Sequence, residues 1–347
     1  MSPPLAHKPE SMNDRATDAR LQVKDIAVTF SVPGSGLFAR RAAVRAVDGV
    51  SFHIDAGEVV ALVGESGCGK TSLARAIAGL VTPSNGQVLL DGAEVTGFPP
   101  HLPALTRAAV QMVFQDPFES LNPRKTVLAT LSQPLRLHRI VAAGGMRAEA
   151  ARLLRLTGLP EDALARYPHE FSGGQRQRIG IARAIAPRPR LLIADEAVSA
   201  LDISIRAQLL ALLGDLKREL ALSMLFITHD LGVVRSFADR VLVMYLGRVV
   251  EEGPTETVFA APRHPYTQAL LAATPIPDPV AARATKRIIL GGDVPSPRAI
   301  PPGCRFHPRC PVAIARCSTE EPARRLLAPG VAASCHRIET SNAHTSP

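Results

Sequence analysis

The 347-residue chain is 46% hydrophobic, which supplies enough apolar material for a folded core and excludes a wholly disordered protein. Its net charge of +9 favours anionic partners such as nucleotides, nucleic acid or an acidic membrane surface, but the basic residues form no long block. The start of the chain is polar, and no run approaches the roughly 18 apolar residues that span a bilayer. We therefore expect a cytoplasmic chain that acts at a membrane only through other subunits.

Strand-like and helix-like patterns alternate along the chain after a loose, flexible arm at residues 1–20. Strands are expected at 21–30, 46–54, 59–63, 110–114, 191–194 and 224–228, with hairpins at 87–95 and 241–251. Helices are expected at 71–80, at 205–219 and repeatedly between 116 and 186. This alternation is typical of an α/β domain with a parallel sheet. Beyond residue 260 Pro becomes dense and cysteines appear, so we place a C-terminal extension at 261–347.

A glycine-rich segment follows the apolar strand at 59–63 and precedes the helix at 71–80. It reads GESGCGKT over residues 64–71 and fits the phosphate-loop pattern G-x-x-x-x-G-K-[ST] in full. The glycines let backbone N–H groups point at phosphate oxygens, Lys70 reaches the β- and γ-phosphates, and the Thr71 hydroxyl ligates Mg²⁺. A chance glycine-rich turn is the alternative, but it would not need this flanking strand and helix. The residues expected to surround the phosphates are Gly64, Glu65, Ser66, Gly67, Cys68, Gly69, Lys70, Thr71 and Ser72.

Two predicted strands end in side chains that suit nucleotide hydrolysis. The strand at 191–194 runs into Asp195 and Glu196, and the strand at 224–228 runs into His229. The carboxyl ends of parallel strands are where α/β sheets place ligands, so these side chains should meet at the edge that carries the phosphate loop. Asp195 would hold Mg²⁺, and Glu196 would polarise the attacking water. A solvated acidic turn and a structural histidine are the alternatives.

Further motifs resemble those of ATP-binding cassette (ABC) proteins and occur in that family's order. The segment Phe171–Gln175 resembles the signature LSGGQ with Phe in place of Leu, and Ser199–Asp202 resembles the D-loop. Gln115 matches the Q-loop, His229 the switch histidine, and Phe30 the aromatic residue that stacks on adenine. The nucleotide-binding residues added by this resemblance are Phe30, Gln115, Ser172, Gly173, Gly174, Gln175 and Asp202.

The resemblance implies an ABC-type P-loop nucleotide-binding domain at residues 21–260, with a RecA-like parallel sheet, an antiparallel β subdomain and a helical subdomain at 116–186. It implies an ATPase in which two such domains sandwich Mg-ATP head to tail, the signature of one chain completing the site of the other. The implied ligands of Mg²⁺ are Thr71, Gln115 and Asp195. The implied catalytic residues are Glu196, His229 and Gln115. Ala197 departs from the Pro common in the family, which should loosen the turn that aims Glu196 without removing any chemistry.

A narrower resemblance indicates the ATPases of dipeptide/oligopeptide importers. It rests on segments 63–70, 114–117, 120–124, 167–170 and 198–202 and on His264–Thr267, which resembles the start of that group's C-terminal extension. The sequence of these segments resembles the second, F-type ATPase of these systems more than the first, D-type one. The resemblance implies a D-type ATPase as partner, two transmembrane permeases, a solute-binding protein that acts indirectly, and a place on the cytoplasmic face of the cell membrane. The transported solute does not follow from the sequence.

Four of the five cysteines gather in the extension as Cys304-x5-Cys310-x6-Cys317-x17-Cys335. In a cytosolic chain such a group indicates metal before disulfides, and four thiolates suit zinc or a [4Fe–4S] cluster. The close cysteine pairs common at zinc sites are missing, which favours the iron–sulfur cluster, and the importer resemblance implies the same. His307 and His336 are alternative ligands. Four incidental thiols in a Pro-rich tail remain the other interpretation.

Two other functions fit part of the sequence. A soluble ABC ATPase acting on nucleic acid or ribosomes would use the positive charge, but such proteins usually carry paired ABC domains or a long coiled-coil insertion. An ABC exporter would usually fuse transmembrane helices to this domain or lack this tail. The segment His264–Thr267 and the cysteine pattern favour an importer, so no nucleic-acid partner is expected.

Overall fold

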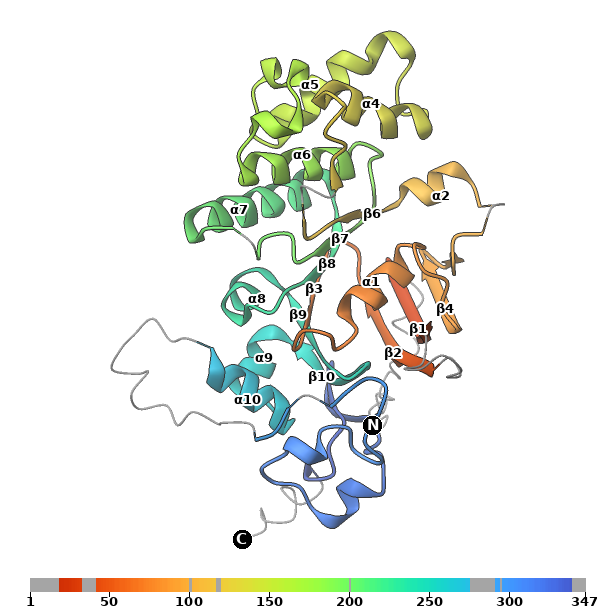
Figure 1. Ribbon diagram of the computed structural model, residues 1–347, viewed down its shortest axis with the longest axis vertical. Coiled ribbons are helices and arrows are strands. Elements are labelled where there is room, and N and C mark those ends of the chain that lie inside the picture. The colour runs from red at the N-terminus through yellow and green to blue at the C-terminus, as the bar shows by residue number, and fades with distance from the viewer. Residues whose placement is uncertain are drawn as a thin grey trace, which may run out of the picture.

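The main sheet of the computed structural model has eight strands in the order β11-β12-β10-β9-β3-β8-β7-β6 (Figure 1). Residues 19–32, 42–99, 102–116, 120–199, 201–274, 291–293 and 295–338 are described, so most of the expected arm at 1–20 lies outside them. The strands are β3 (Val59–Val63), β6 (Val110–Val113), β7 (Leu191–Asp195), β8 (Ser223–Ile227), β9 (Arg240–Tyr245), β10 (Arg248–Pro254), β11 (Arg325–Ala328) and β12 (Val331–Ala333). The five from β6 to β9 are parallel, as expected, and β10, β12 and β11 add an antiparallel edge.

A second, antiparallel sheet has the order β2-β1-β4-β5. Its strands are β1 (Leu21–Val32), β2 (Ala42–Ile54), β4 (Asn85–Leu90) and β5 (Ala93–Glu94). The expected hairpin is confirmed at Asp91 and Gly92, whose φ angles of 47° and 77° are those of a tight left-handed turn. This sheet pairs Phe30 with Val44, so β1 and β2 reach the nucleotide site together.

Figure 1 shows how the helices are distributed along the molecule. Helix α1 (Lys70–Ile77) contacts strands of both sheets, and α4, α5 and α6 gather at one end, away from the C-terminal segment. The remaining helical bounds are α2 (Ala104–Ala108), α4 (Val127–Leu137), α5 (Met146–Leu156), α6 (Gly173–Ile185), α7 (Ile203–Leu220), α8 (Leu231–Phe237), α9 (Thr255–Ala260) and α10 (Pro265–Ala273). Among the described residues, every helix is too short or too polar to cross a bilayer.

Helix α1 ends earlier than the predicted Leu80. Gly79 adopts φ 71°, and the Leu80 N–H donates to the Arg75 carbonyl (2.8 Å), which closes the helix with a left-handed glycine cap. The Cβ of any other residue at 79 would meet the Phe98 ring at 2.3 Å. Gly79 therefore closes the helix, and the predicted range of 71–80 extended past it.

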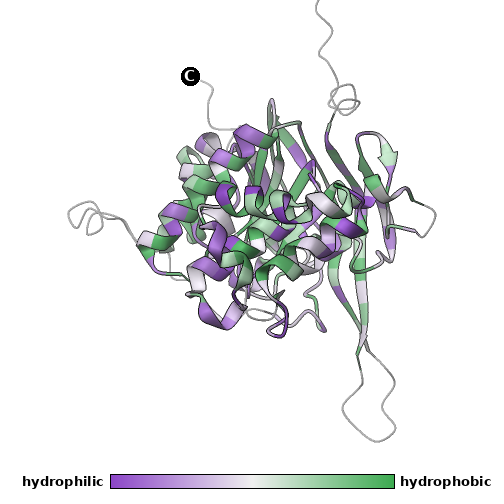
Figure 2. Cartoon of the chain, turned by 90° about the horizontal axis from the view of Figure 1, so that it is seen from above, coloured by the Kyte–Doolittle hydropathy of each residue, from purple (hydrophilic) through white to green (hydrophobic). Residues whose placement is uncertain are grey.

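The apolar core lies on both faces of the main sheet, and Figure 2 shows its apolar residues along the interior strands. All five residues of β3 are buried. Val59 packs with the cluster that includes α4, α5 and α6, whereas Val60 and Leu62 pack with α1 and the second sheet. A strand buried on both faces reads as a continuous apolar run, which is why its bounds were predicted without error.

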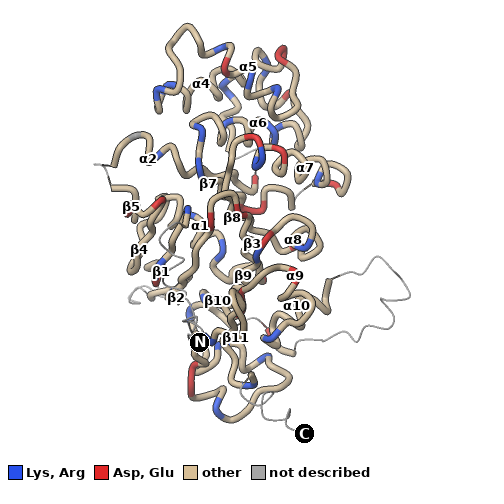
Figure 3. Tube along the Cα trace, turned by 180° about the vertical axis from the view of Figure 1, so that it is seen from behind, with Lys and Arg blue, Asp and Glu red and all other residues tan. Residues whose placement is uncertain are grey.

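The chain beyond residue 260 packs directly on the main sheet. Strand β12 pairs with β10, and β11 pairs with β12. Tyr266 from α10 and Phe306 are both buried in an apolar cluster with Tyr245 of β9. Neither strand of this segment was expected from the sequence. In the described part of the chain Lys and Arg are spread from α4–α6 to this segment and form no single basic stripe (Figure 3).

Candidate active site

The phosphate loop connects the end of β3 to the start of α1, as predicted. Gly69 takes the N-cap position of α1 with φ 108°, a conformation that favours glycine. Backbone also approaches both end glycines closely: an added Cβ would lie 2.2 Å from the Met244 oxygen at Gly64 and 2.1 Å from the Ala46 oxygen at Gly69. The loop is therefore wedged between β9 and β2, which fixes its curvature.

Lys70 is buried at the mouth of this loop. Its Nζ donates to the carbonyl oxygens of Gly64 (2.8 Å) and Glu65 (3.0 Å). These two bonds hold the ammonium over the concave side of the loop, close to the N-terminus of α1. A buried ammonium and a helix N-terminus together form a strongly anion-attracting position.

The first residues of α1 meet the acid at the end of β7. The Thr71 hydroxyl donates to Asp195 Oδ1 over 3.2 Å, which joins residues 124 positions apart in the sequence. Burial raises the pKa of the Asp195 carboxyl above its usual value, and the bond from Thr71 acts in the opposite direction. A hydroxyl and a carboxylate placed side by side are oxygen donors of the kind that Mg²⁺ prefers.

Glu196 lies between two other predicted residues. Gln115 Nε2 donates to Glu196 Oε2 (3.0 Å), and His229 Nδ1 lies 3.6 Å from Glu196 Oε1. Gln115 follows β6, Glu196 follows β7 and His229 follows β8, three neighbouring parallel strands. The expectation that carboxyl ends of strands bring these side chains together is confirmed in this geometry.

The turn that carries Glu196 is held in an uncommon conformation. Its φ is 48°, in the left-handed region that disfavours residues with a side chain. The Glu196 N–H donates to the Ile227 carbonyl (3.0 Å), and Ser199 donates to the Glu196 carbonyl through both N–H (3.1 Å) and Oγ (2.9 Å). Ala197, where the family commonly has Pro, is buried in this turn, which is closed by these hydrogen bonds.

Lys70, Thr71, Gln115 and Glu196 line a cavity of about 350 Å³, whereas Asp195 and His229 do not line it. Predicted residues from four places along the chain line it, and so do residues that sequence reasoning missed. The predicted lining residues are Phe30, Ser66, Gly67, Cys68, Gly69, Lys70, Thr71, Ser72, Gln115 and Glu196. The missed ones are Val44, Arg45, Ala46, Leu246, Gly247 and Pro297. Pairing of the predicted strand around Phe30 with the next strand would have found Val44, but no local signal marks the others.

The signature segment lies apart from this cavity. Ser172 caps α6, its Oγ accepting from Gln175 N–H (3.4 Å) while its own N–H donates to Gln175 Oε1 (3.0 Å). Asp202 is the N-cap residue of α7, and Gly174 approaches Ile205 so closely that an added Cβ would lie 2.7 Å from it. Ser172 and Gln175 thus form a reciprocal capping box, and within one chain these residues do not line the cavity. Ala200 and Pro117, of the D-loop and Q-loop segments, lie outside the described residues.

Comparison with known proteins agrees with this architecture. The family described as "ABC transporter" matches residues 47–199, and that described as "Oligopeptide/dipeptide transporter, C-terminal region" matches residues 250–317. The oligopeptide transport ATP-binding protein AppF of Bacillus subtilis is 46% identical over 318 residues, covering 91% of this chain and 96% of AppF. The chain belongs to the family of peptide ABC transporter ATP-binding proteins. It is thus an ABC-type ATPase, as the motifs predicted.

Two further proteins support the same placement of this ATPase. The di/tripeptide transport ATP-binding protein DppF of Pseudomonas aeruginosa is 46% identical over 321 residues, covering 92% of this chain and 98% of DppF. A dimeric bacterial ABC transporter cassette of known structure matches with a TM-score of 0.60 and 28% identity, covering 68% of this chain and 98% of that one. The names AppF and DppF agree with the predicted likeness to F-type ATPases.

The four cysteines of the extension come near one another in the ATPase, and none forms a disulfide. The Cys304 N–H donates to the Cys317 carbonyl (2.8 Å), and burial raises the pKa of the Cys304 thiol to about 11, with smaller contributions from the other three thiols. Yet no group of three or more His, Cys, Asp or Glu in the described ranges is arranged to hold a metal ion. The expected metal site is therefore not preformed.

The two histidines considered as alternative ligands have other partners. His307 Nδ1 lies 2.9 Å from the Cys304 carbonyl oxygen, and His336 Nε2 lies 2.9 Å from the Glu320 carbonyl oxygen. Each of these ring nitrogens thus faces a backbone oxygen, which leaves only the other nitrogen of each ring for a metal.

Proposed function

We propose that this ATPase drives a membrane importer for di- or oligopeptides. The observation that carries the ATPase chemistry is that Lys70, Thr71 and Glu196 line one cavity, with Asp195 bonded to Thr71 beside it. Support for the peptide cargo comes from AppF and DppF, which are named as transport ATP-binding proteins for oligopeptides and for di- and tripeptides. The spread of basic residues offers no support for the nucleic-acid alternative.

The residues at the start of α1 and the end of β7 fit Mg²⁺. Thr71 Oγ1 and Asp195 Oδ1 are hard oxygen donors within 3.2 Å of each other, and the side-chain oxygen of Gln115 is the third donor that we assign. The ion, when bound, neutralises charge on the β- and γ-phosphates. Lys70 meets the remaining phosphate charge from the loop side, and Phe30 at the rim of the cavity stacks on adenine.

Glu196 accepts a proton from the attacking water in the proposed reaction. Its two carboxylate oxygens are engaged by Gln115 and His229, which fixes the direction in which the carboxylate points. Gln115 and His229 position this carboxylate and, in turn, the water.

The working unit that we propose is a head-to-tail dimer. Support comes from the separation of Ser172–Gln175 and Asp202 from the cavity of their own chain, since these residues can then face a partner's nucleotide. Gly173, where an added Cβ would have its nearest neighbour at 3.8 Å, leaves the N-terminus of α6 open to close approach by a phosphate, whereas Gly174 packs against Ile205. A D-type ATPase is the partner that we infer, bound with this chain at the cytoplasmic face of two membrane-spanning permeases. A solute-binding protein acts indirectly, from outside the membrane.

We propose the division of the chain made from the sequence: an arm at 1–20, the ABC domain at 21–260 with its helical part at 116–186, and the extension at 261–347. The gathering of α4, α5 and α6 at one end of the molecule supports the helical part (Figure 1). The extension shares the main sheet through β12, so it forms one body with the ABC domain.

We propose further that Cys304, Cys310, Cys317 and Cys335 bind a [4Fe–4S] cluster, with zinc as the alternative. Their unpaired thiols and their position in one small segment support this proposal. Because the thiols are not placed as a ligand set in this structure, binding requires local rearrangement of the extension. Protein purified without oxygen should carry about four iron atoms and four sulfides per chain. Stoichiometric zinc, or no metal, would refute the cluster.

The test of the transport function is affinity purification of the tagged chain from its native membrane. Two multi-span permeases and a second ABC ATPase should copurify, and ATP hydrolysis in the assembled complex should rise with a peptide-loaded binding protein. A matched preparation carrying Lys70→Ala should keep the partners and lose the hydrolysis. Recovery of ribosomal proteins or nucleic acid without permeases would overturn the import assignment and leave the ATPase chemistry intact.

A further inference from the structure

Residues of the extension bind the phosphate loop at Glu65, the residue that follows the first glycine of the loop. Arg309 Nη1 and Nη2 donate to the two Glu65 carboxylate oxygens at 2.6 and 2.9 Å, a two-point ion pair. The Glu65 N–H donates to the Tyr266 hydroxyl over 2.8 Å. Side chain and backbone of one loop residue are thus both held by residues beyond 260. The Arg309 side chain is only 7% exposed, so solvent screens this pair weakly.

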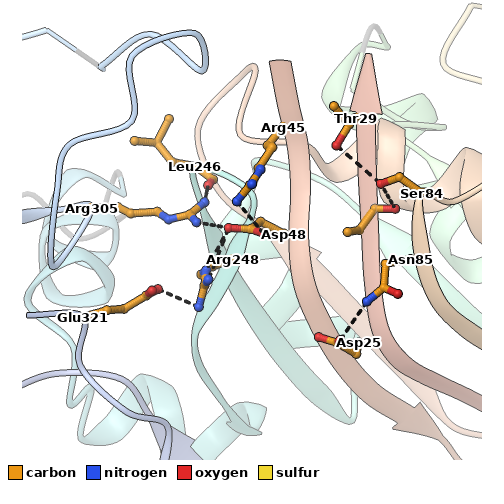
Figure 4. Close-up of polar contacts among 11 residues, drawn as sticks. Asp25, Thr29, Arg45, Asp48, Ser84, Asn85, Leu246, Arg248, Arg305 and Glu321 are labelled. Atoms are coloured by element: carbon orange, nitrogen blue, oxygen red, sulfur yellow. Dashed lines mark hydrogen bonds and ion pairs between the residues drawn. The ribbon is translucent and has the colours of Figure 1, made fainter. Parts of the chain in front are cut away.

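The extension makes a second set of contacts with the turn between β9 and β10, which also lines the nucleotide cavity. Arg305 donates to the Leu246 carbonyl and to the Asp48 carboxylate, which Arg248 also contacts (3.2 Å; Figure 4). In the same turn the Gly247 N–H donates to the carbonyl of Cys68 in the phosphate loop (2.8 Å). Arg305 therefore stabilises the turn between β9 and β10, which contacts the loop, while Arg309 binds the loop itself.

An aromatic anchor fixes the segment that carries both arginines. Phe306 lies 5.2 Å from the Tyr245 ring and 5.4 Å from the Tyr266 ring, and it is 1% exposed. Tyr266 is the residue whose hydroxyl accepts from the loop. The aromatic contacts of Phe306 and the polar contacts of Arg305 and Arg309 thus join segment 304–310 to the phosphate loop and to the turn beside it.

The charge of Glu65 gives this contact a consequence for the nucleotide. The Glu65 side chain does not line the nucleotide cavity, but Ser66, the next residue of the loop, does, so an uncancelled negative charge on Glu65 would repel the anionic triphosphate over a short distance. We propose that Arg309 is a positioning residue of the ATP site, which neutralises Glu65 and holds the loop open for phosphate. This inference rests on the proposed function, since it assigns ATP as the ligand of the loop.

A double substitution in the full-length chain tests whether the charge of Glu65 changes the affinity for ATP in the expected direction. Arg309→Ala leaves Glu65 charged and unpaired, so ATP affinity should fall about tenfold, which corresponds to about 1.4 kcal/mol. Adding Glu65→Gln removes the repelling charge and should restore most of that affinity. Arg309→Lys should lie between, because it keeps the charge and loses the two-point geometry. KM for ATP should follow these changes, with kcat kept within about twofold, because loop and phosphate are in contact before and during the reaction.

Arg324→Ala is the matched control. Arg324 also joins the extension to the body, through Glu252 of β10, but among the described residues it contacts none of the phosphate loop. Mg-ATP titration by calorimetry, with thermal unfolding of the same samples, should show unchanged affinity for Arg324→Ala. Equal losses in Arg324→Ala and Arg309→Ala would overturn the inference, since general docking of the extension would explain both. So would wild-type affinity in Arg309→Ala, or no recovery on adding Glu65→Gln. A wild-type chain that binds ATP no better than Lys70→Ala would instead refute the proposed function itself.

Discussion

Replacement of Glu196 by Gln tests the proposed chemistry with the smallest change of shape. The amide keeps one oxygen, which can still accept from Gln115 Nε2 at 3.0 Å, but it can no longer take a proton from water. A positioned general base contributes about 10²–10⁴-fold to a rate, or about 2.7–5.4 kcal/mol at 1.36 kcal/mol per factor of ten. Turnover in Glu196→Gln should fall by that factor, while the affinity for ATP stays within about threefold.

The assay is phosphate release by the assembled complex, together with ATP titration of the isolated chain. Stability should change by less than about 0.5 kcal/mol, since the backbone turn at 196 and its hydrogen bonds remain. Glu94→Gln, the same chemical change on the exposed strand β5, should leave turnover as it was. If Glu196→Gln keeps turnover within tenfold of wild type, Glu196 is not the base.

The other predictions concern the phosphate loop and the extension. Lys70→Ala should abolish tight ATP binding in a titration, because the phosphate charge is no longer met. Gly69→Ala should destabilise the protein by about 3 kcal/mol or more in denaturant unfolding, because the new Cβ would lie 2.1 Å from the Ala46 oxygen. Gly57→Ala, also at positive φ but with nothing within 4 Å, should cost only about 1 kcal/mol. Burial lowers the pKa of His264 from 6.5 to about 3, so the unfolded chain binds a proton there that the folded chain does not. Stability should therefore fall as the pH drops below 6.5 towards 3, and His264→Asn should remove part of that fall.

Distinct results would contradict each of these. Unchanged ATP affinity in Lys70→Ala would argue against the phosphate-loop assignment. Similar unfolding midpoints for the two glycine variants would show that the loop does not lie so close to β2 in solution. An unfolding curve between pH 6 and 4 that is the same for His264→Asn and wild type would mean that the imidazole is not buried in its neutral form.

The parts of the fold that local patterns determine were predicted well. Strand β3 is buried on both faces and forms an uninterrupted apolar run, and the loop after it is defined by residue types at fixed spacing. Asp195 and Glu196 were found because the end of a parallel strand is a fixed place in this class of fold. The meeting of Glu196 with Gln115 and His229 depends on the order β8-β7-β6, which the sequence did not predict.

The contacts of the extension could not be predicted, because nothing local encodes them. Arg309 and Glu65 are 244 residues apart, and Arg305 and Asp48 are 257 apart. An arginine in a Pro-rich segment has the same appearance whether it is solvated or paired. Strand β12 has three residues and exists only because β10 offers it an edge. The four cysteines show the opposite case, since their spacing predicted a metal site that the described geometry does not preform.

The pairing of β12 with β10 has a practical consequence for shortened forms of this protein. A chain ending at residue 260 would keep every nucleotide motif but would expose the backbone donors and acceptors of β10 along one edge of the sheet. It would also remove Arg324, the nearer counter-ion of Glu252, which is 4% exposed, and leave only Arg240 at 4.0 Å. Bare edge strands recruit strands from other molecules, and a buried charge that loses its nearer partner destabilises a fold. Aggregation of such a truncated ATPase would therefore report the loss of an edge cover, not the loss of ATP binding.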